Sequence, residues 1–170
     1  MPDLHDLRTQ RSALEQAIET RQRALGPDHP DLADDLRELG RLTHELGDFA
    51  DAQVLLRRAL AIHTEALGAG HFEAATDINH LGLVLHDLGD LDGALAAFER
   101  ALAIDEAALG RTHVNVARDT NNLAGVLRDL GDGFSAREAL DWSLSIYLRE
   151  LGADHPTTKS VARNRRMLGG

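Results

Sequence analysis

The sequence has no cysteine and few cationic residues, and both shortages exclude classes of function. Among its 170 residues, 28 are acidic and 18 are basic, which gives a formal net charge of −10 at pH 7. This negative charge argues against the phosphate backbone of a nucleic acid, or an anionic membrane surface, as the main partner. Without cysteine, the chain has neither disulfides nor thiolate metal sites.

Long hydrophobic runs are also missing. No apolar stretch comes near the roughly 18 residues that a membrane-spanning helix needs, and the N-terminus has no signal-peptide pattern. Apolar residues nevertheless make up 43% of the chain, which is enough for a folded core. These features predict a cytoplasmic protein of one domain.

Motifs that carry catalysis or bind a cofactor are absent as well. The sequence has no Gly-x-Ser-x-Gly, no phosphate-binding glycine loop and no His-Glu-x-x-His. Its many carboxylates follow helical surface patterns, so no acid–base pair stands out among them. The sequence therefore predicts no enzymatic activity and no cofactor.

What the sequence does contain is a repeat. The dipeptide Leu-Gly recurs every 42 residues, at Leu25-Gly26, Leu67-Gly68, Leu109-Gly110 and Leu151-Gly152. Self-similarity at a fixed period is typical of stacked repeat proteins, in which each unit buries its apolar face against its neighbours. Within each unit, apolar residues recur at helical spacing on both sides of a Gly-Asp turn, and this pattern predicts two helices.

This period divides the whole chain into an all-α solenoid of about eight helices. A leading helix (1–26) precedes three full repeats (27–68, 69–110 and 111–152), and a trailing capping helix (153–170) follows. The expected helices are Leu4–Leu25, Asp31–Leu46, Phe49–Leu67, Glu73–Leu88, Leu91–Leu109, Asn115–Leu130, Phe134–Leu151 and Thr157–Leu168. The leading helix matches the second helix of a repeat whose first helix is missing, which favours an excised fragment or a cap.

The histidines suggest a metal site, but their spacing argues against one. His29, His71, His113 and His155 occur one per loop, 42 residues apart. Successive loops should lie about a repeat width apart, too far for one ion held at about 2 Å from each ligand. We therefore expect these histidines to be loop or cap residues, and we expect no metal site.

Small residues recur where the two helices of a repeat must approach closely. They are Gly40, Gly82 and Ala124 in the first helices, and Ala52, Ala94 and Ala136 in the second. Large apolar residues such as Leu56, Phe98 and Leu140 fill the gaps between them. A large side chain at a small position is expected to overpack this contact.

This pattern resembles the tetratricopeptide repeat (TPR) family, whose helix pairs have Leu-Gly in the first helix and Ala, a bulky apolar residue and Ala in the second. Here those positions are Leu81-Gly82, Ala94, Phe98 and Ala101. The usual period is about 34 residues. The longer period, together with Leu-Gly-Pro-Asp-His-Pro at 25–30 and Asn-Asn-Leu-Ala at 121–124, resembles the kinesin light chain class. Similar arrays form sensor regions of bacterial regulatory proteins, and the composition favours a bacterial source.

The resemblance implies a right-handed superhelix whose concave wall is built by the first helices. The residues expected to line this groove are Arg37, Arg41, Asn79, His86, Arg118, Asn121 and Arg128. Arg binds carboxylates through paired hydrogen bonds, and Asn bonds an extended peptide backbone, so the row favours an acidic peptide or protein segment as partner. The alternative is a solvated surface on which these residues pair with Asp34, Glu45, Asp87 and Asp129 and bind nothing.

Two further roles remain open. Half-repeats at both ends leave room for self-association through the terminal helices, which gives a homo-oligomer. A third reading is a receptor that closes around a short signal peptide. Trp142, whose equivalents are Arg58 and Arg100, either packs on a neighbouring loop or is an interface residue.

Overall fold

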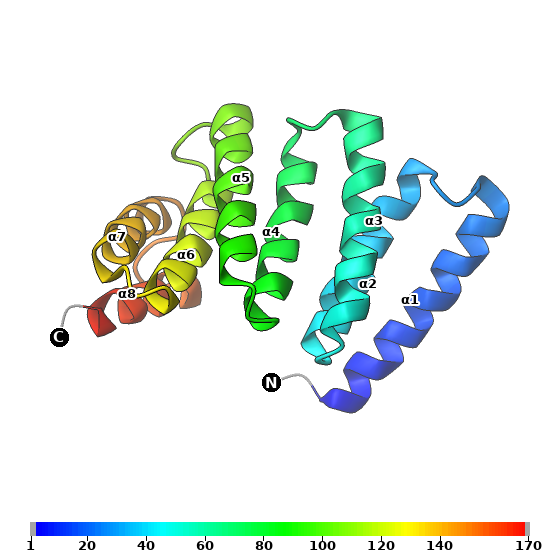
Figure 1. The fold of residues 1–170 in the computed structure, drawn as a ribbon, viewed down its shortest axis with the longest axis horizontal. Coiled ribbons are helices and arrows are strands. Elements are labelled where there is room, and N and C mark those ends of the chain that lie inside the picture. Colours follow the sequence, from blue (N-terminus) through cyan, green and yellow to red (C-terminus); the bar gives the residue numbers. More distant parts are fainter. Residues whose placement is uncertain (1–2, 169–170) are drawn as a thin grey trace.

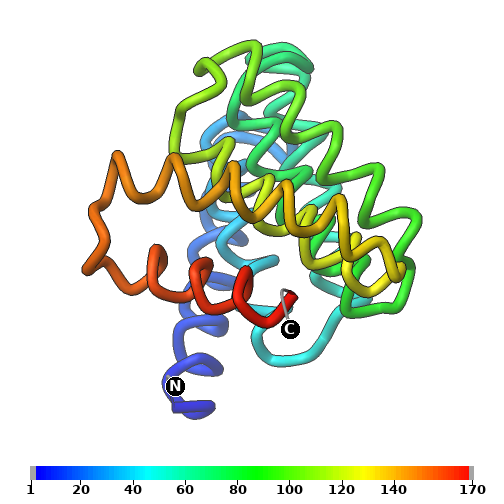
Figure 2. The backbone as a smooth tube through the Cα atoms, turned by 90° about the vertical axis from the view of Figure 1, so that its left-hand side faces the viewer, coloured from blue at the N-terminus to red at the C-terminus, as the bar shows by residue number. Residues whose placement is uncertain are grey.

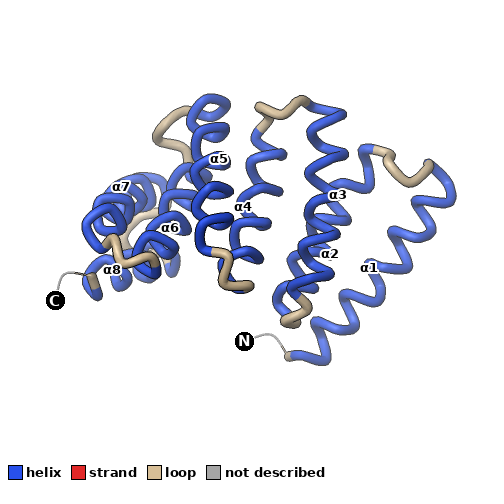
Figure 3. Tube along the Cα trace, viewed as in Figure 1, coloured by secondary structure: helices blue, strands red, loops and turns tan. Residues whose placement is uncertain are grey.

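The computed structural model describes residues 3–168 as a row of helices joined by short loops (Figure 1). The helices are α1 (Leu4–Leu25), α2 (Ala33–Glu45), α3 (Phe49–Leu67), α4 (Phe72–Asp87), α5 (Leu91–Leu109), α6 (Val114–Asp129), α7 (Gly133–Glu150) and α8 (Pro156–Met167). A short 3-10 helix, η1 (Pro30–Leu32), precedes α2. The described residues contain no strand (Figure 3), so the all-α prediction is confirmed.

The beginning of α2 is the one place where the observed helix differs in kind from the expected one. The sequence predicts a single helix from Asp31, whereas the structure has a 3-10 turn before the α-helix begins at Ala33. In this turn the Leu32 amide donates to the His29 carbonyl at 3.0 Å. Pro30 lacks an N–H and fits the first turn of a helix, and tighter turns of this type are common at helix N-termini.

The helices pack as sequential antiparallel pairs, and each packs mainly against its neighbours along the chain. In addition, α2 packs against α4, and α4 against α6, so these three helices form an inner layer. At the C-terminal end, α8 runs antiparallel beside α7 (Figure 2). It makes no comparable contact with α6, which leaves a gap in the inner layer between α6 and α8.

Histidines cap the N-termini of η1, α4, α6 and α8. The Nδ1 atoms of His29, His71, His113 and His155 accept hydrogen bonds from the backbone N–H two residues further on, at 3.1 to 3.3 Å. Each bond satisfies one of the amides that a helix N-terminus leaves without a partner. The expectation that these histidines are loop or cap residues is therefore confirmed.

Each repeat is held together by a close approach of its two helices. A Cβ atom added at Gly82 on α4 would lie 2.7 Å from Cε1 of Phe98 on α5. A Cβ added at Gly40 on α2 would lie 2.7 Å from Cγ of Leu56 on α3. Phe98 and Leu56 are fully buried, so neither can turn aside into solvent. Glycine at these positions is required by the packing and not by the backbone conformation.

Neighbouring repeats are joined by one pair of positions whose chemistry changes along the chain. The pairs are Arg21–Asp35, His63–Asp77, Asp105–Asp119 and Tyr147–Val161, each 42 residues after the one before. Arg21 and Asp35 form an ion pair between α1 and α2. His63 Nδ1 lies 2.6 Å from Asp77 Oδ2 between α3 and α4. In the last pair, Tyr147 and Val161 are both members of the buried apolar cluster around α7.

Asp105 and Asp119 form a buried pair of carboxyl groups between α5 and α6. Both are completely buried, and Asp105 Oδ1 and Asp119 Oδ2 have no hydrogen-bond partner within the described residues. A proton shared between the two carboxyl groups would give both atoms a partner. Arg118 Nη2 lies 2.8 Å from Asp119 Oδ1 and 3.3 Å from Asp105 Oδ2. Burial, only partly offset by Arg118, raises the pKa of Asp119 to about 7 and also raises that of Asp105.

Replacing Gly82 by Leu tests the close approach. We expect Gly82→Leu to lower the free energy of unfolding by about 1–3 kcal/mol or more, because the added side chain collides with the buried Phe98 ring. Gly125→Leu is the matched control, since a Cβ at Gly125 meets no atom within 4 Å. Leucine there gains helix propensity of up to about 1 kcal/mol. Urea unfolding followed by circular dichroism compares the two, and equal stability of the variants would contradict the packing argument.

Replacing Asp119 by Asn tests the shared proton. A carboxyl whose pKa is raised by folding binds its proton more tightly in the folded chain than in the unfolded one, where the ordinary value is 3.8. The stability that this pair contributes is therefore full below about pH 4 and is lost as pH rises through about pH 7. Asn donates to Asp105 at any pH, so Asp119→Asn should be roughly 1–3 kcal/mol more stable than the wild type at about pH 8.

The measurement is urea unfolding at about pH 5 and about pH 8. Asp35→Asn serves as the control, because Asp35 pairs with a guanidinium and not with a second carboxyl. We expect a flatter dependence of stability on pH for Asp119→Asn alone. If this variant keeps the slope of the wild type, Asp105 and Asp119 do not share a proton.

Candidate functional site

The residues predicted to line the groove all lie on the inner helices. Arg37 and Arg41 are on α2, Asn79 and His86 on α4, and Arg118, Asn121 and Arg128 on α6. Most of them contact the chain's own polar groups. The prediction that they pair with nearby carboxylates is confirmed for Arg37 with Asp34, Arg41 with Glu45 and Arg128 with Asp129. Surface pairs of this kind contribute about 0–1 kcal/mol, so an acidic partner can still compete for the exposed ones.

Arg37 is the centre of an ionic cluster that joins α2 to α4. Its Nη1 lies 2.5 Å from Glu73 Oε2 and 3.5 Å from Asp77 Oδ1, and its Nη2 contacts Asp34. The donor atoms of Asp34, His63 and Glu73 lie within 4.8 Å of one another, a spacing that would suit a metal ion. The guanidinium of Arg37 already supplies positive charge to Asp34 and Glu73, so the cluster is explained as an ion-pair network. Burial raises the pKa of the neighbouring Asp77 to about 6, against the opposite effects of His63 and Arg37.

Asn79 and Arg118 both contact the carboxylate of Asp119. The Asn79 amide donates to Asp119 Oδ1 at 2.7 Å and accepts from Asn122 Nδ2 at 3.2 Å, and its side chain is only 1% exposed. These bonds hold α4 against α6. Arg118, which is half-buried, is engaged with the carboxyl pair. Both residues therefore hold the inner helices in place. A partner segment could contact neither side chain unless these helices repacked.

A second ladder, meaning a row of contacts from one inner helix to the next, lies near the C-terminal ends of these helices. His44 Nε2 on α2 lies 2.6 Å from Asp87 Oδ2 on α4, and His86 Nε2 on α4 lies 2.8 Å from Asp129 Oδ2 on α6. Arg128 is the next member of this series. It is exposed, and its one hydrogen bond within the described residues runs from Nε to Asp129 on its own helix at 2.8 Å. Its two terminal nitrogens are left to donate to other groups.

A first ladder of contacts between inner helices, Arg37 to Asp77 and Asn79 to Asp119, ends at Asn121. Arg37 and Asn79, at the same position of earlier repeats, contact Asp77 and Asp119 on the next inner helix. The corresponding residue for Asn121 is Val161 on α8, which offers no polar atom. Within the described residues, Asn121 Oδ1 is buried and accepts no hydrogen bond. A buried acceptor without a donor is unfavourable and uncommon.

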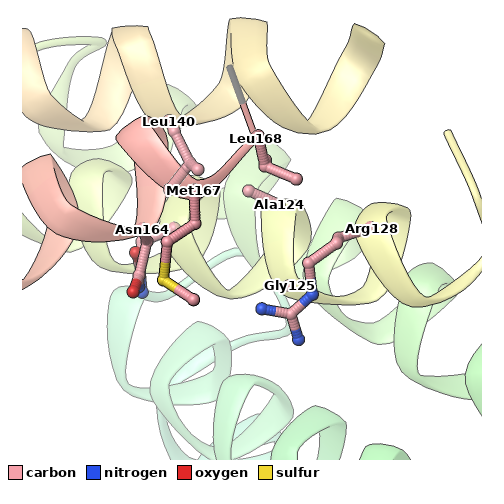
Figure 4. A pocket seen from close by; sticks show the side chains of 8 residues that line it. Ala124, Gly125, Arg128, Leu140, Asn164, Met167 and Leu168 are labelled. Carbon is pink, nitrogen blue, oxygen red and sulfur yellow. The ribbon is translucent and has the colours of Figure 1, made fainter. Parts of the chain in front are cut away.

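A pocket of about 350 Å³ lies beside Asn121 and Arg128, between α6 and α8 (Figure 4). Its other walls are Ala124, Gly125, Leu140, Asn164, Met167 and Leu168. Figure 4 shows the side chains of Asn164 and Met167 across the pocket from Arg128. Gly125 opens this space, because the equivalent positions are Arg41, Leu83 and Met167 and no atom lies within 4 Å of a Cβ built there.

Sequence reasoning identified Asn121 and Arg128 on α6 but missed the walls that α7 and α8 contribute to this pocket. The missed walls come from α7 and α8, whose approach to α6 no periodicity specifies. One signal was available, since Gly125 and Val161 both depart from the larger or polar residues of the other repeats. A glycine facing the inner surface indicates a place where the layer is open.

Trp142 on α7 packs on a neighbouring loop, the first of the two predicted environments. Its ring is half-buried against the C-terminal core, and the guanidinium of Arg111 lies 4.9 Å from the ring centroid. Arg58, the equivalent residue on α3, likewise donates to the Pro27 carbonyl of the preceding loop. An interface role for Trp142 stays a prediction. The most exposed aromatic in the described range is Phe134, at 74%.

No helix among residues 3–168 is long and apolar enough to cross a membrane. No curated protein matches the chain. Solved structures, however, share its fold. BtubC (BKLC) from P. vanneervenii has a TM-score of 0.79 and 23% identity, with 95% of this chain covering 65% of that one. A Podosopora anserina protein described as a kinesin light chain with nearly identical TPR-like repeats has a TM-score of 0.78 and 22% identity, over 95% of this chain and 76% of that one.

The apo form of RapI has a TM-score of 0.81 and 17% identity, over 95% of this chain and 56% of that one. The chain thus spans less than two thirds of BtubC and of RapI. The sequence itself matches a tetratricopeptide repeat family over residues 11–65 and 72–132, and a second tetratricopeptide repeat family over 120–157. These matches cover more than half of the residues. The chain therefore belongs to the tetratricopeptide repeat family.

Proposed function

We propose that this chain is a non-catalytic interaction module that binds an acidic peptide or protein segment along its concave face. TPR repeats typically mediate protein–protein interactions. The observation that carries the proposal is that two arginines of the inner layer stay exposed in a chain of net charge −10. Arg41 and Arg128 keep 35% and 52% of their side chains exposed, on α2 and α6 of the same layer. We place the module in the cytoplasm of a bacterium, as a sensor or regulatory part of a larger protein.

Internal pairing does not remove these arginines from a partner's reach. Arg41 contacts Glu38 and Glu45 on its own helix, and such contacts within one turn or two are weak and screened by salt. A peptide carboxylate that forms two parallel hydrogen bonds to a guanidinium provides a better defined contact. Arg37 and Arg118, in contrast, are engaged in buried networks and support the surface from beneath.

Substitution on the two faces of the solenoid tests this proposal. An array of short peptides of graded acidic content identifies a probe that the wild-type chain binds. We expect the double variant Arg41→Gln/Arg128→Gln to weaken its affinity at least about tenfold, which corresponds to about 1.4 kcal/mol. The control is Arg57→Gln/Arg100→Gln, which removes the same charge from exposed positions of α3 and α5.

Fluorescence anisotropy at two salt concentrations gives the affinities. Binding through the arginines should weaken as salt rises, because exposed charges are screened. Equal losses in both double variants would show that net charge alone attracts the peptide. If no acidic peptide binds the wild type, the proposed function is wrong.

Self-association is the second candidate, and α1 is the helix that favours it. Only Leu7 and Ile18 of this helix are buried, while Leu4 and Leu25 are 58% and 44% exposed. Among the described helices α1 packs mainly on α2, so its other side is open. The opposite end is less suited to apolar contact, because the exposed side of α8 carries Lys159, Arg163 and Arg166.

Light scattering across a wide range of protein concentrations separates the two candidates. We expect a constant mass near 18.5 kDa, because the exposed apolar residues of α1 are scattered rather than gathered in one stripe. A mass that doubles or climbs with concentration would make assembly through the terminal helices the first candidate. Leu4→Gln/Leu25→Gln should then restore the monomer.

A further inference from the structure

Helices α5 and α6 meet at the joint between the second and third repeats, where Arg118 contacts both members of the buried carboxyl pair, Asp105 and Asp119. We propose that this joint is a proton-operated switch, which is closed while the two carboxyl groups share a proton and opens locally when that proton is lost. Opening divides the solenoid into two folded parts, residues 3–109 and 114–168. The switch is a property of the joint and does not depend on which partner the inner layer binds.

The first argument is the number of charges at the joint. At the two preceding joints an aspartate faces a nitrogen base, Arg21 or His63. At the equivalent position this joint has Asp105, so two carboxyl groups share a single cation, Arg118. With both carboxyl groups ionised, the joint would hold one uncompensated negative charge away from solvent, which is unfavourable. Uptake of one proton makes the joint neutral.

The second argument is that the hydrogen bonds of the carboxyl pair leave a place for this proton. Arg118 and Asn79 donate to Asp119 Oδ1, at 2.8 Å and 2.7 Å, and Arg118 Nη2 lies 3.3 Å from Asp105 Oδ2. The other two oxygens, Asp105 Oδ1 and Asp119 Oδ2, are buried and have no hydrogen-bond partner within residues 3–168. A shared proton provides the missing bond. Once it is lost, two carboxylates repel each other away from solvent, where screening is weak.

The other titratable groups that face this site come from α4, α6 and α7. Burial lowers the pKa of His80, which faces Arg118 from α4, to about 4. Burial raises the pKa of Tyr147 on α7 above its ordinary value of 10.0. Both side chains therefore stay uncharged between about pH 5 and about pH 8. His113, which caps α6 and acts on Asp105 through space, is the remaining group and requires its own control.

The joint can open while the parts on either side stay folded, because each part has a buried cluster of its own. Ile78 and Ala101 belong to a cluster before the joint. Ala117 and Leu140 belong to another cluster after it. Loss of the proton disturbs neither cluster directly, so its effect is concentrated where α5 meets α6.

An apolar contact across the joint limits how many molecules open. Phe98 on α5 and Val126 on α6 belong to one buried cluster, which keeps the joint closed in most molecules at any pH. Burial in the closed joint raises the pKa of Asp119 to about 7, whereas the ordinary value is 3.8. The closed form therefore holds the proton more tightly than the open form does. The ratio of open to closed molecules should rise about tenfold between about pH 6 and about pH 8.

Thiol reactivity measures the open form, because the chain has no cysteine of its own. Val116→Cys places a single thiol on the first turn of α6, at a fully buried position in the cluster against which Leu102 of α5 packs. Ala74→Cys is the matched control, since Ala74 is the equivalent, fully buried residue at the preceding joint. The rate of each folded variant with a disulfide reagent is divided by its rate in urea at the same pH, which removes the effect of thiol ionisation.

We expect the relative reactivity of the Val116→Cys thiol to rise about tenfold between about pH 6 and about pH 8. That of the Ala74→Cys thiol should change less than about threefold, because the charge of Asp77 at that joint is faced by both His63 and Arg37. Circular dichroism at each pH checks that the variants are folded. If Val116→Cys does not fold, Leu102→Cys measures the same joint from α5.

Two further substitutions in the Val116→Cys chain identify the titrating group. With Asp119→Asn the rise should disappear and the reactivity should stay at its low level, because asparagine donates to Asp105 at any pH. With His113→Asn, which keeps a side-chain acceptor at the helix cap, the rise should remain.

The outcomes decide whether the joint is a switch. A rise confined to Val116→Cys and removed by Asp119→Asn supports the proposal, and a flat profile for Val116→Cys contradicts it. If both thiols become more reactive in parallel, loss of the proton unfolds the chain as a whole and the joint does not open locally. If the rise disappears with His113→Asn but persists with Asp119→Asn, the histidine is the titrating group and the proposal is wrong.

Discussion

The close approach of the two helices within each repeat is the contact on which the rest of the structure depends. Gly40 against Leu56 and Gly82 against Phe98 allow the helix axes to come together, because no Cβ separates them. This contact sets the distance between inner and outer helices. The 42-residue period then repeats that distance along the chain, so equivalent residues of successive inner helices face one another. The contacts between inner helices, such as Arg37 with Asp77 and Asn79 with Asp119, depend on this spacing.

Within that constant frame, the joints between repeats vary in chemistry. The same two positions hold an ion pair, a His–Asp pair, two carboxyl groups and finally a Tyr–Val contact. The packing does not require one particular choice, since helices of neighbouring repeats contact each other at all four joints. The choice alters how the stability of each joint depends on pH. It also alters how many hydrogen-bond donors and acceptors remain free for neighbouring residues. In a repeat protein, stability is approximately a sum of repeat and interface contributions, so we expect each joint to contribute differently as pH changes.

The inner layer forms more hydrogen bonds and ion pairs within the chain than its row of cationic residues suggests. Arg37, Asn79 and Arg118 are engaged in contacts between inner helices, and these contacts hold the surface in shape. Free capacity gathers where the ladders lose their partners, at Asn121 and Arg128. There the inner layer also has its gap, because α8 packs on α7 rather than on α6. An unsatisfied acceptor, an open volume and the exposed Arg128 coincide at one place, and this coincidence distinguishes the pocket from the rest of the inner layer.

The sequence by itself determined the periodic features: the eight helices, the glycine contacts, the capping histidines and the side of the solenoid on which Arg41 and Arg128 lie. All of these follow from residue type and the 42-residue spacing, because an interaction that recurs in every repeat leaves the same residue types at the same interval in the sequence. Only the tertiary structure decided which side chains of that face are free. Asn79 and Asn121 are equivalent in sequence, yet one is buried in a ladder and the other borders a pocket. The difference arises because a side chain's partners belong to the next helix, and Val161 on α8 replaces the aspartate that the earlier repeats supply.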